Sequence, residues 1–241
     1  MKLNIIKRLS GVAIFCFLPG CVLANMSVYP MEVGIGETGA AQIRVISQSD
    51  GVQFVKVMEK QILNPGTKQE QEADVEQFGQ SSLVITPQKL AISAGSQRLV
   101  RLVALELPEK ETTWRVYFEG VPELEDNVAA ASPQMTTTKV GINLVWGALV
   151  HVAPKKAIAS LTLDAQRGQV INDGTLRIPL REVGVCDQGG VCNWKKETTT
   201  IYPGTELKIA SLMVMPGKKY KARYFNWLKK RVEEIDLSVK L

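Results

Sequence analysis

Short runs in which apolar and polar residues alternate recur along the chain, and they constrain its fold more than any other feature. These runs occupy residues 41–45, 98–103, 114–119, 176–181 and 235–241. A period of two places every second side chain on one face of a β-strand. Turn signals such as Asn64-Pro65-Gly66 and Asn172-Asp173-Gly174 lie between the runs. Because no segment keeps a helical period, the sequence predicts an all-β protein built as a sandwich or a barrel.

The first 24 residues, MKLNIIKRLSGVAIFCFLPGCVLA, are typical of a secretory signal peptide. Three basic residues precede an apolar run at 9–18, which is too short to span a bilayer as a helix. We expect cleavage after Ala24. An alternative is a lipoprotein leader in which Cys21, at the end of Leu18-Pro19-Gly20-Cys21, carries the lipid.

Export places the chain in an oxidising compartment, and this bears on its cysteines. Only Cys186 and Cys192 lie beyond residue 21, so we expect them to form a disulfide, the alternative being two free thiols. Two cysteines and one histidine cannot build a zinc ribbon, an iron–sulfur site or a two-imidazole metal site. We therefore expect no metal and no cofactor.

The charge balance does not favour nucleic acid as a partner. The chain has 29 Lys and Arg against 24 Asp and Glu, and loss of the three basic leader residues leaves a net charge of +2. Seven basic residues do gather between 218 and 231. On an exported β-hairpin, such a cluster is expected to be a solvated face.

The longest uninterrupted strand-like segment, TTTKVGINLVWGALVHV at 136–152, is rich in β-branched residues and contains no proline. It ends at Ala153-Pro154, which is typical of a hinge. We expect one domain at 25–153 and a second at 154–241, each of ordinary sandwich size.

Several motifs, in order along most of the mature chain, resemble the periplasmic chaperones of the chaperone/usher pilus pathway. They are Thr86-Pro87-Gln88-Lys89, Ala94-Gly95, Arg98-Leu99-Val100-Arg101-Leu102, residues 114–119 and the long segment 136–154. The motifs at 64–67, 86–89, 115–119 and 172–178, together with the two cysteines and Tyr202-Pro203-Gly204, resemble the alternate branch, of the colonisation-factor and common-pilus type.

The resemblance implies two immunoglobulin-like β-sandwich domains set in an L or boomerang, located in the periplasm and without enzymatic activity. Such chaperones bind pilin subunits that lack their last strand and deliver them to an outer-membrane usher. No small-molecule substrate is implied, and the free protein is expected to be either a monomer or self-associating.

In such a chaperone, a strand is lent to the subunit. The alternating row Val140, Ile142, Leu144 and Trp146, within a donor strand at about 138–150, is the candidate here. The alternative is that this row packs only into its own core.

The resemblance also implies a cation for the subunit's terminal carboxylate. The better-known branch uses an arginine early in the first strand and a lysine late in the long strand. Here the early position falls at or near Glu32, and the late one matches His151. We therefore expect an anchor drawn from His151, Thr138, Arg44 and Arg115. The alternatives are a strand histidine with satisfied hydrogen bonds and, for Arg115, a solvated strand face.

The alternative functions are those of a pilus structural subunit or adhesin, a hydrolase and a lipid-anchored β-sandwich binding module. A hydrolase would have His151 as its only imidazole base, and the sequence has neither a Gly-x-Ser-x-Gly elbow nor a phosphate-binding Gly-x-x-x-x-Gly-Lys loop.

Overall fold

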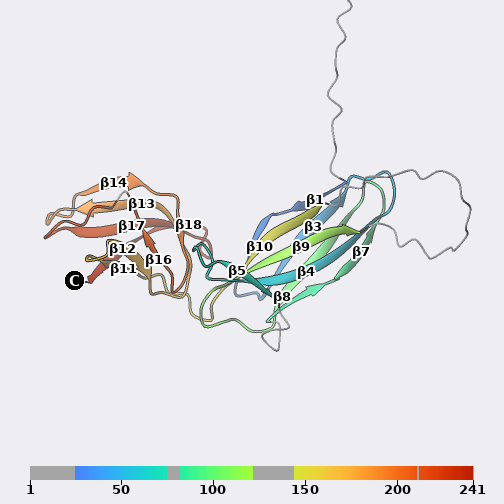
Figure 1. Ribbon diagram of the computed structural model, residues 1–241, viewed down its shortest axis with the longest axis horizontal. Coiled ribbons are helices and arrows are strands. Elements are labelled where there is room, and N and C mark those ends of the chain that lie inside the picture. The colour runs from blue at the N-terminus through green and yellow to red at the C-terminus, as the bar shows by residue number, and fades with distance from the viewer. Residues whose placement is uncertain (1–24, 75–81, 122–143, 211, 241) are drawn as a thin grey trace, which may run out of the picture.

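The computed structural model describes residues 25–74, 82–121, 144–210 and 212–240. The leader, Thr138, Val140 and Ile142 lie outside these ranges. Within them the regular structure is entirely β, which confirms the predicted fold class. The same ranges contain no helix long and apolar enough to span a membrane. Figure 1 shows two β-rich bodies that meet at an obtuse bend.

The first body is a sandwich of two sheets. The four-stranded sheet has the order β1-β3-β8-β6 and is formed by β1 (Met26–Tyr29), β3 (Ala40–Ser47), β8 (Gln97–Ala104) and β6 (Leu83–Thr86). The six-stranded sheet has the order β2-β10-β9-β4-β5, from β2 (Glu32–Ile35), β10 (Val145–Val152), β9 (Thr112–Val121), β4 (Gln53–Leu63) and β5 (Gln71–Asp74), with β7 (Lys89–Ile92) also paired to β4. Strand β10 runs parallel to β2 and antiparallel to β9.

The core of this sandwich is formed by the alternating residues that the sequence singled out. Ile43 and Val45 of β3 share it with Val116 and Phe118 of β9, and all four side chains are fully buried. Burial of an aliphatic side chain contributes about 1.5–3 kcal/mol. A slip of one residue in any strand would turn its apolar row towards water, so this burial fixes the register.

The second body is built on one eight-stranded sheet that folds over its own core. The order is β14-β13-β17-β18-β11-β12-β16, with β15 paired to β13. Its strands are β11 (Leu161–Asp164), β12 (Gln169–Asn172), β13 (Ile178–Cys186), β14 (Cys192–Lys196), β15 (Thr200–Ile201), β16 (Glu206–Lys208), β17 (Lys219–Asn226) and β18 (Arg231–Lys240). Figure 1 shows β13, β14 and β17 in a layer above β11, β12 and β16.

A disulfide joins Cys186 to Cys192 across the β13–β14 turn, as predicted. Asp187 closes the turn because its Oδ1 accepts the Val191 amide at 2.8 Å, and Gly190 supplies the positive φ of 84°. A cross-link over so short a loop stabilises the domain by about 2–3 kcal/mol, mainly by restricting the unfolded chain.

Acidic neighbours pair with most of the basic cluster on the β17–β18 hairpin. Lys221 and Arg223 bind Glu234 at 2.9 and 3.3 Å, and Lys229 and Arg231 both bind Glu233. This arrangement matches the solvated strand face expected from the sequence.

Candidate functional site

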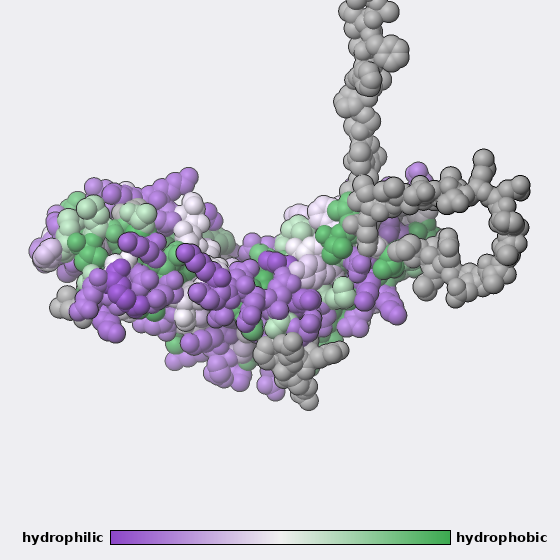
Figure 2. Space-filling model, in the orientation of Figure 1, coloured by the Kyte–Doolittle hydropathy of each residue, from purple (hydrophilic) through white to green (hydrophobic). Residues whose placement is uncertain are grey.

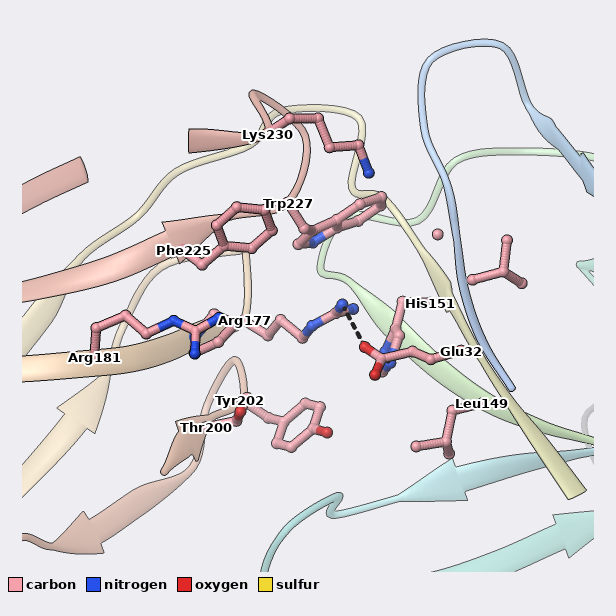
Figure 3. Close-up of a pocket in the computed structure, with 13 residues that line it drawn as sticks. Glu32, Leu149, His151, Arg177, Arg181, Thr200, Tyr202, Phe225, Trp227 and Lys230 are labelled. Carbon is pink, nitrogen blue, oxygen red and sulfur yellow. Dashed lines mark hydrogen bonds and ion pairs between the residues drawn. The ribbon is translucent and has the colours of Figure 1, made fainter. Parts of the chain in front are cut away.

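A cavity of about 440 Å³ lies between the two domains, beside the strand that ends the first one (Figure 3). We refer to it as the cleft. The first domain lines it with Glu32, Val33, Gly34, Leu149 and His151, and the second with Arg177, Pro179, Arg181, Thr200, Tyr202, Phe225, Trp227 and Lys230.

The wall of the cleft is held together by Glu111, whose carboxylate is fully buried. Arg177 donates to it twice, from Nη1 to Oε1 at 2.6 Å and from its backbone N–H to Oε2 at 3.0 Å. Trp227 Nε1 donates to Oε2 at 3.2 Å. Because all three donors belong to the second domain, one carboxylate of the first domain fixes the contact between the two.

Close backbone approach adds to this contact. The Trp227 ring lies so near Gly34 of β2 that a Cβ atom at that position would overlap it. A second close approach joins Tyr202 to Gly66, which has a positive φ of 73° in the turn after β4. Neither position can hold a larger side chain without a shift of the neighbouring ring.

His151 is part of the cleft wall but is almost completely buried, with 1% of its side chain exposed. Its Nε2 lies 3.4 Å from Glu32 Oε1, and its Nδ1 lies 3.3 Å from Thr113 Oγ1. These contacts suit a neutral ring that carries its proton on Nε2 and accepts from the threonine hydroxyl.

Electrostatics also favour the neutral form. Burial lowers the pKa of His151, and although the hydrogen bond with Glu32 opposes this, the charge of Arg177 acts with it. The pKa therefore lies below its ordinary value of about 6.5, and the ring is uncharged at neutral pH. The same hydrogen bond lowers the pKa of Glu32, which also binds Arg177 Nη2 at 3.1 Å.

Of the four expected anchor residues, the structure brings only His151 to the cleft. Arg115 instead binds Glu72 at 2.7 Å on the outer face of the six-stranded sheet. Arg44 lies exposed on β3 of the other sheet, between Tyr29 and Leu99. Thr138 is outside the described residues. Arg44 and Arg115 are therefore not among the residues that line the cleft, whereas the neutral His151 is. The role of these residues as a subunit anchor stays a prediction.

The cleft draws its positive charge from the second domain instead. Arg177 forms ion pairs with Glu111 and Glu32, which balance its charge. Within the described ranges, Arg181 and Lys230 form no ion pair. Arg181 Cζ lies 5.8 Å from the centroid of Phe225, and Lys230 Nζ lies 5.9 Å from that of Trp227. Figure 3 shows both on the second-domain side of the cavity, on either side of the two aromatic rings.

The alternation of β10 separates two rows of side chains. Trp146, Ala148, Val150 and Val152 face the core of their own domain, whereas Leu149 and His151 line the cleft. Trp146 shares the inward face with Ala148 and Val150 and packs against the core of its own domain. Its expected place in a partner's groove stays a prediction. Leu144, on that face one step earlier, is 38% exposed, and Val140 and Ile142 are not described.

Comparison with known proteins identifies the family. A CFA/I fimbrial subunit of Escherichia coli is 32% identical over 187 residues, which cover 75% of this chain and 77% of that protein. The crystal structure of the class 5 fimbriae chaperone CfaA has a TM-score of 0.72 and 26% identity, over 90% of this chain and all of that one. A chain in the structure of a chaperone–tip adhesin complex of CFA/I fimbriae has a TM-score of 0.70 and 26% identity, over 89% and 99%.

The chain belongs to the chaperone/usher pilus chaperones, in the colonisation-factor branch. No family model matches it. The two sandwiches are accordingly the immunoglobulin-like domains of that family, as the sequence predicted.

The sequence did not reveal the three cationic residues that line the chaperone's cleft, although one signal was present. Arg177 and Arg181 alternate with Leu176, Ile178 and Leu180, so they were visible as the outer row of a strand. Nothing in the sequence showed that this row faces the other domain rather than water. Lys230 belongs to the run of basic residues in the hairpin, which indicated only a solvated face.

The buried histidine predicts a pH dependence of stability. The unfolded chain takes up a proton near pH 6.5, whereas folded His151 does so only at lower pH, so stability falls as the pH drops below about 6.5. The loss amounts to about 1.4 kcal/mol for each unit by which folding lowers the pKa. Above pH 6.5 the contribution is fully retained.

Denaturant unfolding of the native chain and of His151→Gln between about pH 7 and pH 5 measures this effect. The free energy of unfolding should decline less steeply in the variant over that interval. Equal slopes for the two proteins would contradict the assignment of a lowered pKa to His151.

Proposed function

We propose that this chaperone works in the periplasm, where it binds pilin subunits by lending them part of its long strand and passes them to an outer-membrane usher. The observation that carries the proposal is the inward row of β10. Trp146, Ala148 and Val150 pack in the chaperone's own core, and the row continues to Leu144, which is 38% exposed. The same face would supply Ile142 and Val140 to a second core.

A pilin that lacks its last strand exposes an apolar groove beside an unpaired strand edge, and such a surface aggregates. A lent strand covers both the groove and the edge, since its main chain pairs along the edge while alternate side chains fill successive pockets of the groove. Because β10 belongs to a folded sheet at 145–152, its neighbouring residues would be held in register for a partner. The donor segment we propose is 138–147.

The cleft is suited to hold the end of the subunit chain. A terminal carboxylate taken out of water needs charged or hydrogen-bonding partners, and without them its burial costs several kcal/mol. Arg181 and Lys230 have the charge for this role, and their aromatic neighbours leave room for an apolar side chain beside it. We therefore assign the anchor to these two residues, with His151 and Glu32 shaping the opposite wall.

Other features of the chain fit this role. Residues 1–24 serve as the export signal, and the domain boundary falls near residue 153, after β10 and before β11. The single imidazole of the sequence is buried against Glu32 and Thr113, which suits support of the cleft better than catalysis. We propose binding without chemistry, with no cofactor and no nucleic-acid or small-molecule substrate.

A pilus structural subunit is the other candidate, because the Escherichia coli relative is itself named as a fimbrial subunit. The two bodies argue for the chaperone, since the described strands of each enclose their own buried core. A soluble purified protein that captures a pilin would support the chaperone, whereas assembly into fibres would support the structural role. Retention of lipid on Cys21, seen by mass spectrometry, would instead support an anchored module.

Strand donation predicts a contrast between adjacent residues of the donor segment. Leu144→Glu, or Ile142→Glu, would place a charge in a closed apolar groove, so recovery of a co-expressed pilin should fall at least tenfold. Val145→Glu, or Asn143→Glu, on the opposite face should have a much smaller effect. Val145 is a matched control for Leu144 because both side chains are apolar and exposed, at 47% and 38%. Equal loss in the two folded variants would count against donation in this register.

The cleft assignment predicts a loss of pilin binding when the charges of Arg181 and Lys230 are reversed. Arg181→Glu together with Lys230→Glu should weaken binding at least tenfold, since a carboxylate would then meet two like charges. Lys195→Glu with Lys196→Glu, on exposed positions of β14, is the matched control and should bind as the native chain does. If both pairs bind equally well, the anchor lies elsewhere.

A further inference from the structure

The end of the second domain opposite the cleft carries a group of exposed apolar side chains. Val191 is 72% exposed, Met213 65%, Met215 40% and Val214 37%. The first lies in the β13–β14 turn and the others lie in the segment before β17. Figure 2 shows apolar surface at this extremity, at the left of the view. We call these residues, with Lys218 and Lys219, the distal tip.

The two segments of the distal tip are neighbours. Gln188 Nε2 donates to the Gly217 carbonyl at 2.6 Å, and Lys219 pairs with Cys186, which in turn pairs with Cys192. Strand β17 runs from Lys219 to Asn226, just before Trp227 of the cleft. Eight strand residues span about 25 Å, so the tip is well separated from the proposed subunit site.

The backbone of the tip is anchored while its side chains face outwards. The hydroxyl of Tyr220, a residue that is 2% exposed, accepts the Met215 amide at 2.6 Å and donates to the Met215 carbonyl at 3.1 Å. The other segment is fixed by the disulfide and by Asp187. Two anchored loops therefore hold apolar side chains in water, where their exposure is unfavourable unless something covers them.

The composition of the tip favours a lipid surface. Lys218 and Lys219 are exposed beside the apolar residues, so the basic side chains of the tip outnumber the one carboxylate of its turn, Asp187. Protein interfaces are depleted in lysine, whereas apolar side chains flanked by lysines are the pattern of peripheral contact with anionic membranes.

We propose that the distal tip is a peripheral membrane-contact site that binds anionic phospholipid surfaces, with Val191, Met213, Val214 and Met215 entering the interface and Lys218 and Lys219 contacting headgroups. Each apolar side chain removed from water adds to binding in proportion to its buried area, and each lysine strengthens it about fivefold near an anionic surface. Because the tip lies far from the cleft, the chaperone would bind a pilin and a membrane at the same time.

Co-sedimentation of the mature protein with vesicles tests this site. Vesicles of phosphatidylethanolamine and phosphatidylglycerol should bind the protein, and phosphatidylcholine vesicles should bind it much more weakly. Lys218→Gln with Lys219→Gln should weaken binding about 25-fold at low salt, from two losses of about fivefold. Val191→Ser with Met213→Ser should weaken it at least tenfold.

A matched control is Leu99→Ser, which removes an apolar side chain that is 52% exposed on the first domain and should leave vesicle binding unchanged. Failure to bind anionic vesicles would overturn the proposal, as would equal loss in Leu99→Ser. Concentration-dependent dimers that the tip variants abolish, without vesicle binding, would show that a second copy covers the tip instead. Pilin binding by the tip variants is measured in parallel, so this result is separable from the proposed chaperone function.

Discussion

A single buried carboxylate sets the arrangement of the two domains, and the cleft depends on it. Glu111 of the first domain has no exposed side-chain surface, and three donors from Arg177 and Trp227 of the second domain bind it. Bonds to a charged group are worth about 1.5–3 kcal/mol each, and a buried charge left without its partner costs about 3–5 kcal/mol. Rotation of one domain against the other would break these bonds together, so the cleft keeps one shape.

Strand β10 connects this arrangement to the proposed activity because its two faces serve different surroundings. The row from Trp146 to Val152 completes the core of the first domain, and the row with Leu149 and His151 lines the cleft. A partner that pairs with the segment before residue 145 would therefore be packed against by side chains of the same face that fills the chaperone's core. The end of the partner's chain would bind in the cleft, on the opposite face of the same strand.

The sequence was a good guide to whatever depends on local periodicity, and a poor one to whatever depends on how the domains pack. Alternation predicted the strands that bury Ile43, Val45, Val116 and Phe118, and the isolated cysteine pair predicted the disulfide. Periodicity shows which residues share a face but not what that face meets. It placed Trp146 in the same row as Leu144, for example, but did not show that Trp146 packs against the chaperone's own core.

The same limit applies at the cleft. The partner of Glu111 is 66 residues away in sequence, and no local pattern links it to Arg177. Arg181 was visible only as the polar side of a strand, because its place beside the cleft depends on how the two domains meet. His151 was expected as a member of a cationic or hydrogen-bonding anchor, and the sequence did not show that burial lowers its pKa, because burial is a property of the assembled fold.

Hydrogen exchange at the donor segment is the most direct test of the central claim. The chaperone would be co-expressed with a candidate pilin encoded beside its gene, and amide exchange at 138–147 would be compared in the free and bound protein. Strand donation predicts exchange at least tenfold slower in the complex, because the main chain pairs with the pilin's edge. Unchanged exchange at 138–147 in a stable complex would show that the chaperone holds its pilin by other means.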